Sequence, residues 1–214
     1  MKIHVRDDLP QAFLEVIRGD DLKSIALAGG STPRKVYERW SKQRCPWESM
    51  HFFFGDERMV PPDDARSNFR MAREALLAQV PAKVHRIRGE DPPEAAASSY
   101  ERELQQFFGA DGRFDLVILG VGTDGHTASL FPGTSVLDSD RWAEAVWSES
   151  QSEHRVSLTF PVLNAARKTI VLAKGADKAE VITRWVNGRA TDLPIGRLKG
   201  NIHLLLDETA ASKL

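Results

Sequence analysis

The sequence predicts one α/β domain over residues 1–214, with a mainly parallel sheet and helices on both of its faces. Short, nearly continuous apolar runs are typical of strands that are buried on both faces, and they occur at 25–28, 52–54, 114–119, 170–173 and 202–206. Segments with apolar residues at helical spacing lie between them, so strand and helix alternate. In such a sheet the functional side chains gather beyond the carboxyl ends of the strands.

The charge balance and the cysteine content exclude several classes of protein. The chain has 29 basic and 30 acidic side chains, so we expect no nucleic-acid partner and no membrane partner. Because Cys45 is the only cysteine, the chain forms no internal disulfide and no metal site built from several thiolates. The sequence has no apolar run of membrane-spanning length, and its first residues lack the apolar core of a signal peptide, so we expect a cytoplasmic protein.

The first predicted strand is followed by a glycine turn and a helix start. Gly29 and Gly30 end the strand, Ser31 or Thr32 suits the N-cap, and Pro33 suits the first helical position. A structural cap alone needs one hydroxyl and no glycine pair. Free helix amides beside two hydroxyls therefore indicate an anion pocket, and a phosphate is the expected anion. A serine-hydrolase elbow is excluded, because that motif needs a glycine at the proline position.

Charged residues follow the second predicted strand directly. Asp56, Glu57 and Arg58 come after Gly55, where an open α/β sheet keeps its functional groups. One interpretation is that they form surface ion pairs of little energetic value. The other is that Arg58 points into the crevice and offers a permanent charge and several donors to a substrate oxygen, while Asp56 orients Arg58 or binds sugar hydroxyls.

The third predicted strand ends in a Gly-x-Gly-x-x-Gly pattern at Gly120, Gly122 and Gly125. A dinucleotide-binding fingerprint also needs a helix that starts there and an acidic residue that ends the next strand. Here the acidic residues near the required spacing lie in a turn-like segment, and Asp124 would place a carboxylate against the pyrophosphate. The nucleotide hypothesis is therefore weak.

Asp124 and His126 offer a different interpretation of the same loop. An imidazole has an ordinary pKa of about 6.5, which suits a general base near neutral pH. The flexible Gly125 between the two residues would let the Asp124 carboxylate orient the His126 ring. The alternative is that Asp124 caps a short helix after the turn and that His126 is a polar surface residue.

Two later segments supply cations. Arg155 lies in 154–164, and Lys178 lies in 173–182, where Gly175 ends an apolar strand and Asp177 begins a helix whose terminus could face an anion. Either cation alone is typical of a solvated surface charge. Their association with the glycine turns is what makes them candidates for an anion site.

Taken together, these segments resemble the 6-phosphogluconolactonase family. The resemblance rests on GGSTP, GDER followed by SNF, LGVGTDGHTASLFPG, RVSLTFPVLN and KGADKAEVI, in that order, across 25–206. It implies a cofactor-free, Rossmann-like fold that is shared with glucosamine-6-phosphate deaminase. It also implies hydrolysis of 6-phosphoglucono-1,5-lactone to 6-phosphogluconate in the oxidative pentose phosphate pathway.

The resemblance further implies roles for individual residues. His126 takes a proton from the attacking water, Asp124 holds the imidazole, and Arg58 or a backbone amide of the glycine turn stabilises the carbonyl oxygen. Many relatives have a serine where Gly196 stands, so a contact near it would come from backbone or from Arg197. No metal is expected, because the sequence shows no cluster of metal ligands. The substrate-binding residues implied are Gly29, Gly30, Ser31, Thr32, Gly125, Arg155, Lys178 and Arg197.

Two other functions remain as alternatives. A glucosamine-6-phosphate deaminase would typically have Asp-Glu-Tyr where this chain has Asp56 to Arg58, and a catalytic glutamate where Phe131 stands, which cannot transfer a proton. A non-catalytic sugar-phosphate sensor would need a DNA-binding helix pair before the domain, and the stretch before Ile25 is short and not basic. For the protein as a whole, we expect a monomer or a homodimer.

Overall fold

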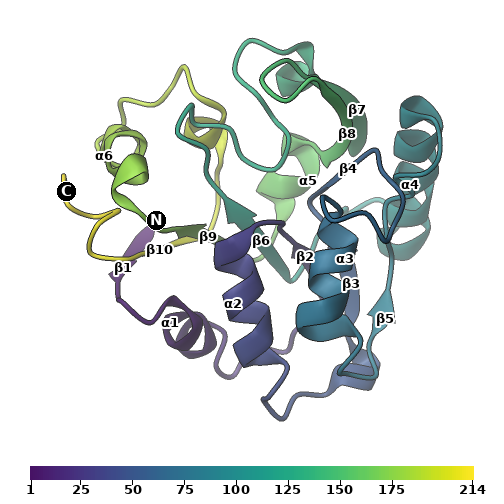
Figure 1. Ribbon diagram of the computed structural model, residues 1–214, viewed down its shortest axis with the longest axis horizontal. Helices are drawn as coiled ribbons and strands as arrows, with labels where there is room; N and C mark the ends of the chain where they lie inside the picture. The colour runs from purple at the N-terminus through teal and green to yellow at the C-terminus, as the bar shows by residue number, and fades with distance from the viewer.

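A seven-stranded parallel sheet forms the centre of the molecule (Figure 1). The structure is a computed structural model that describes all 214 residues. The strand order is β1-β10-β9-β6-β2-β3-β5, and every neighbouring pair is parallel. The strands are β1 (Lys2–Val5), β2 (Ser24–Leu27), β3 (His51–Phe54), β5 (Lys83–Val84), β6 (Leu116–Gly120), β9 (Thr169–Ala173) and β10 (Ile202–Leu206). Each of the five predicted apolar runs forms one of these strands.

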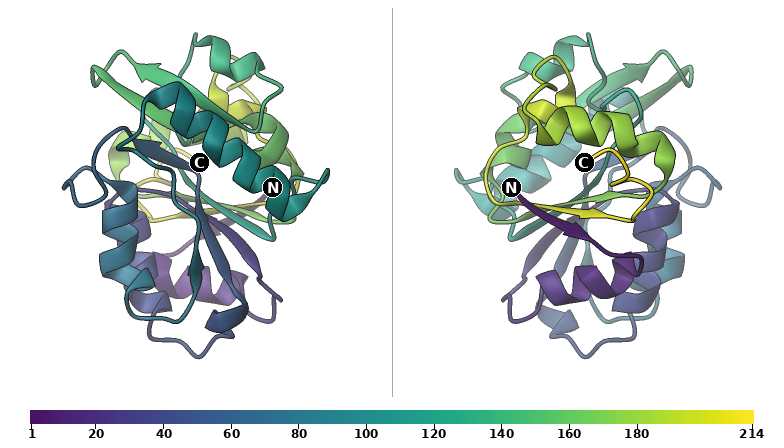
Figure 2. Two further views of the ribbon diagram at one scale, coloured as in Figure 1. Left: turned by 90° about the vertical axis from the view of Figure 1, so that its right-hand side faces the viewer. Right: turned by 90° about the vertical axis from the view of Figure 1, so that its left-hand side faces the viewer.

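Helices cover both faces of this sheet, which confirms the predicted fold class. In Figure 2, α1 and α2 lie on one side of the sheet, and α4 and α6 lie on the other. A continuous core of 59 buried apolar residues joins the layers. No helix is long and apolar enough to span a membrane. The helices are α1 (Leu9–Val16), α2 (Ser31–Trp40), α3 (Asn68–Ala72), α4 (Pro93–Phe108), α5 (Phe160–Ala165) and α6 (Ala179–Val186).

Shorter helical turns complete the connections. The residues Arg73–Leu77 continue α3 as a π-helical turn. Single 3₁₀ turns form at Trp47–Ser49, Ser135–Asp138, Ala176–Lys178 and Pro194–Arg197.

A second, three-stranded sheet lies beside the first, and the sequence did not predict it. It has the order β4-β8-β7 and is antiparallel, with the strands β4 (Asp56–Arg58), β8 (Glu153–Leu158) and β7 (Ala143–Ser148). Charged residues interrupt the apolar pattern of β4 and β8, so neither strand shows a continuous apolar run. Asp56 pairs with Ser157 across the ladder, and Arg58 pairs with Arg155. The small sheet thus brings two of the predicted cations together.

Two buried tyrosines close the carboxyl ends of β2 and β3. The hydroxyl of Tyr37 on α2 donates to Ala28 O and accepts from Ala28 N, both at 2.9 Å. The hydroxyl of Tyr100 on α4 does the same for Phe54, at 2.9 Å to O and 2.8 Å from N. Burial raises the pKa of both phenols, so both remain donors. The hydroxyls therefore satisfy backbone groups where the two strands leave the sheet.

Candidate active site

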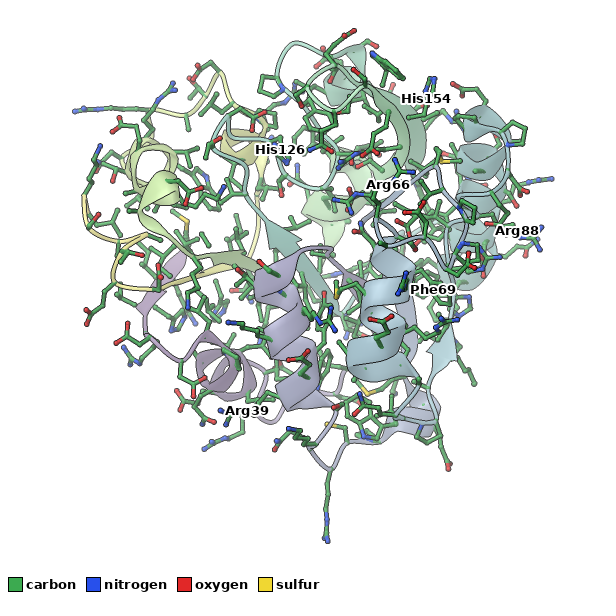
Figure 3. All side chains as sticks on the ribbon, viewed as in Figure 1. Arg39, Arg66, Phe69, Arg88, His126 and His154 are labelled. Carbon is green, nitrogen blue, oxygen red and sulfur yellow. The ribbon has the colours of Figure 1, made fainter.

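A cleft of about 190 Å³ opens at the carboxyl ends of β2, β3 and β6. His126 faces this region from the loop after β6 (Figure 3). Asn68, Ala128 and the ends of the strands complete the lining. The predicted site residues that the cleft brings together are Gly29, Gly30, Asp56, Arg58, His126 and Arg155.

Asp124 and His126 form a hydrogen-bonded pair. The imidazole Nδ1 lies 2.6 Å from Asp124 Oδ1, which also accepts from the His126 amide at 3.1 Å. Burial raises the pKa of the Asp124 carboxyl, but these hydrogen bonds and the charge of the imidazole outweigh it, so the pKa lies below its usual value. No helix follows the turn, so the alternative in which Asp124 caps one is wrong. The carboxylate is ionised and directed at the ring.

The glycines of this loop make room for that pair. A Cβ on Gly122 would overlap both the His126 ring and the Asp124 carboxylate. Gly125 has φ +81°, and its carbonyl accepts from Ile195 N at 2.9 Å, which joins the loop to the turn before Arg197. The helix that a dinucleotide fingerprint requires is missing after this loop, so the glycines serve the histidine.

Glu57 has a structural role between β4 and α3. Its buried carboxylate accepts from the amides of Arg58, Asn68 and Phe69 at 2.8, 2.7 and 2.7 Å, and from the Ser67 hydroxyl at 3.0 Å. Burial raises the pKa of this carboxyl, although the four hydrogen bonds oppose the effect. Glu57 thereby fastens the start of α3 to β4.

Arg58 has a donor without a protein partner. Its Nη1 donates to Arg66 O at 2.5 Å, whereas its Nε is buried without any hydrogen bond. The side chain lines the cleft. Leaving a buried donor unsatisfied is costly, and the fold bears this cost at a side chain that lines the cleft.

Arg155 is buried and strongly engaged. Its Nε and Nη2 donate to Glu153 Oε1 at 3.0 and 2.7 Å, and Nη2 also contacts Gln151. Its Nη1 lies 3.7 Å from Asp56 Oδ2, and its guanidinium lies 5.7 Å from the centroid of the Phe131 ring. Two carboxylates thus balance a cation that is 3% exposed.

The helix start after β2 lies one or two residues before the prediction, which had Ser31 or Thr32 at the N-cap and Pro33 at the first helical position. Gly30, with φ +105°, is the N-cap of α2, and its carbonyl accepts the first helical hydrogen bond from Arg34 N. Ser31 and Thr32 therefore lie in the first turn, and no side chain caps the helix. A glycine adopts this φ without strain, so it takes the position predicted for a hydroxyl residue.

Ser31 and Thr32 do not line the cleft. They line a neighbouring hollow of about 230 Å³ together with Lys35 and Lys174. The hollow and the cleft therefore lie on either side of the turn that contains Gly30.

Two other predicted cations also lie outside the cleft lining. Lys178 Nζ lies 3.0 Å from Asp177, which is 60% exposed. Arg197 donates to Asp138 at 2.8 Å, and Asp138 is 80% exposed. The Arg197 guanidinium also stacks over Phe160, 5.0 Å from the ring centroid. The structure does not bring these two cations to the cleft.

Sequence reasoning missed two polar residues of the cleft region. Asn68 lines the cleft, donates to Asp56 Oδ1 at 3.1 Å, and fills the space that a Cβ on Gly29 would need. Ser129 is fully buried and donates to Asp56 Oδ2 at 2.6 Å. The sequence carried a signal for both residues, because Asn68 lies in the SNF segment and Ser129 lies in LGVGTDGHTASLFPG, but the resemblance assigned a role to neither.

An acid–base pair and two arginines in a cleft at the carboxyl ends of parallel strands define an enzyme site for an anionic substrate. The family model for glucosamine-6-phosphate isomerases and 6-phosphogluconolactonase matches residues 2–206. The chain belongs to this family.

Curated relatives and solved structures narrow the comparison. A 6-phosphogluconolactonase of Nostoc sp. is 38% identical over 204 residues, covering 89% of this chain and 84% of the relative. One of Treponema pallidum is 34% identical, covering 91% and 88%. The structure of the 6-phosphogluconolactonase of Thermotoga maritima has a TM-score of 0.87 at 32% identity, covering 96% and 99%. The predicted resemblance to 6-phosphogluconolactonases is confirmed.

Proposed function

We propose that this protein hydrolyses 6-phospho-D-glucono-1,5-lactone to 6-phosphogluconate and so serves the oxidative pentose phosphate pathway. The observation that carries the proposal is the Asp124–His126 pair in a cleft that Arg58 and Arg155 also line. The names of the relatives support the same activity.

His126 is the general base of the proposed reaction. Because Asp124 accepts a hydrogen bond from His126 Nδ1, the neutral ring carries its proton on Nδ1. Its Nε2 is then free to accept a proton from the attacking water. The water then attacks the lactone carbonyl. General base catalysis of this kind contributes on the order of 10²- to 10⁴-fold.

Arg58 stabilises the charge that develops on the carbonyl oxygen. Its side chain lines the cleft, and its guanidinium offers a permanent charge and several donors to the carbonyl oxygen. Charge-assisted hydrogen bonds in a site that excludes water are the strong kind. Arg58 and His126 thus act on the same carbonyl group.

The phosphate binds at the other end of the substrate. The first amides of α2 have no side-chain cap and follow Gly29 and Gly30, which line the cleft, so these amides suit an anion. Ser31 and Thr32 lie in the same helical turn and line the neighbouring hollow. Arg155 supplies positive charge from the cleft lining.

Lys178 and Arg197 do not line the cleft, so they would reach a bound phosphate only by leaving their present ion pairs with Asp177 and Asp138. These ion pairs are worth little, because both carboxylates are largely exposed.

Phe131 argues against the deaminase alternative. It occupies the position where a deaminase carries its catalytic glutamate, and its ring lies 4.9 Å from the ring of His126. An apolar ring beside the base cannot transfer the proton that ring opening and ammonia release require. A monomeric glucosamine-6-phosphate deaminase has a TM-score of 0.86 to this chain at 19% identity, and this likeness concerns the fold alone.

One assay tests the proposal against that alternative. Freshly generated 6-phosphogluconolactone is mixed with the protein, and hydrolysis is measured above the spontaneous background. Ammonium release from glucosamine 6-phosphate is measured alongside. We expect rapid lactone hydrolysis and no ammonium. Hydrolysis at the background rate, or ammonium release as the main activity, would refute the proposal.

A further inference from the structure

Ser129 connects the loop that carries His126 to the small antiparallel sheet. Its hydroxyl donates to Asp56 Oδ2 at 2.6 Å on β4 and accepts from Arg155 Nη1 at 3.4 Å on β8. Its amide donates to the Ser157 hydroxyl at 3.1 Å, also on β8. All these partners are buried, and Ser129 itself is fully so. Ser129 is therefore a junction between segments that are far apart in the sequence.

The backbone around Ser129 is held in an unfavourable conformation. Ala128, which lines the cleft, has φ +48°, in the left-handed region that residues with a Cβ rarely adopt. It lies in a tight turn in which Leu130 N donates to Thr127 O at 3.0 Å. The hydrogen bonds of Ser129 are placed to hold this turn closed.

The junction fixes the base relative to the cation. Asp56 and Arg58 are two residues apart on β4, so their side chains point to the same side of the strand. Ser129 follows His126 by three residues. A bond from Ser129 to Asp56 therefore sets the position of His126 relative to Arg58, although Ser129 itself does not line the cleft.

We propose that Ser129 is a positioning residue, which holds His126 and Arg58 in register for attack on the lactone carbonyl through its hydrogen bond to Asp56. The role of Ser129 in turnover rests on the proposed hydrolysis, whereas its effect on the position of His126 is independent of that proposal. Because a misplacement of about 1 Å can cost on the order of 10²-fold in rate, loss of this bond affects kcat more than KM.

The test compares Ser129→Ala with a matched serine at the other end of the sheet. Ser24 is also buried and donates to a carboxylate, Asp115 Oδ2 at 3.1 Å, at the amino end of β2. We expect Ser129→Ala to lower kcat about 10- to 100-fold with KM changed less than about threefold, and Ser24→Ala to leave both unchanged. Ser129→Cys keeps the size of the side chain but is a weak donor, so an intermediate kcat is expected.

A second readout does not depend on turnover. The imidazole NMR signals of His126, identified by their loss in His126→Gln, should shift or broaden in Ser129→Ala and stay in place in Ser24→Ala. The inference is overturned if Ser129→Ala keeps kcat within twofold of the wild type, or if the His126 signals do not move. Absence of lactone hydrolysis by the wild type refutes the proposed function instead, and the NMR comparison then still decides the placement role of Ser129.

Discussion

The seven-stranded sheet and the three-stranded sheet contribute to the cleft in different ways. The parallel sheet supplies backbone: the glycine turns after β2, β3 and β6, and the loop that presents His126. The antiparallel sheet supplies side chains, because Asp56, Arg58 and Arg155 all lie on β4 and β8. The large sheet thus supplies the backbone turns and His126, whereas the small sheet supplies the charged side chains of the cleft. Variants in each sheet should therefore fail in different ways.

The largest expected effect comes from the loop of the parallel sheet. We expect His126→Ala to reduce kcat by about 10²- to 10⁴-fold, because the base is lost, while the protein stays folded. Steady-state kinetics on the lactone and binding of 6-phosphogluconate by calorimetry measure the two properties separately. Unchanged turnover in His126→Ala would show that His126 is not the base.

The next effect concerns the charge of the small sheet. Arg155→Met leaves the buried Asp56 carboxylate without its cation and leaves Glu153 paired with Arg66 alone, and breaking a buried pair in this way costs about 3–5 kcal/mol of unfolding free energy. Arg184→Met is the control, because the pair with Asp192 is exposed and its loss should hardly change the free energy of unfolding. Urea unfolding measures both. Equal losses in the two variants would contradict a charged network buried in the small sheet.

The smallest expected effect is a pH dependence of stability that originates in the large sheet and not in the small one. His203 on β10 stacks on His4, and burial, followed by the charges of Lys168 and His4, lowers its pKa to about 4. Between pH 6.5 and 4 the unfolded chain binds a proton at this residue and the folded protein does not. The contribution of His203 to stability should therefore fall as the pH falls through this window and level off below it.

Thermal unfolding across this pH range measures the effect. We expect His203→Gln to reduce the slope, and His154→Gln, on the exposed side of β8, to leave it unchanged. If stability has the same slope against pH in the wild type and in His203→Gln, His203 is not the origin of the pH dependence.

Sequence patterns predicted the parallel sheet better than the rest of the fold. β2, β3, β6, β9 and β10 are buried on both faces, so each is a continuous apolar run. The edge strands β1 and β5 escaped prediction because most of their residues are exposed. β4 and β8 escaped it because charged residues that form buried ion pairs interrupt their apolar pattern, and β7 because only half of its residues are buried.

The same division applies to the site. Glycine turns after buried strands led to His126, Asp124 and Arg58, which the structure places in or beside the cleft. Ser129 as the partner of Asp56 was missed, because the LGVGTDGHTASLFPG segment does not show which of its side chains is buried. The start of α2 was misplaced by one or two residues, since the sequence gives no sign that Gly30 adopts a positive φ.

The tyrosines at the strand ends have a consequence for the loops that follow β2 and β3. Each hydroxyl satisfies both the N–H and the C=O of one residue at a strand end, Ala28 or Phe54, so the following loops need not supply partners for these groups. Tyr37 and Tyr100 come from helices on opposite faces of the sheet, which anchors the two strand ends from both sides (Figure 2). A substitution in either loop therefore leaves these four hydrogen bonds in place.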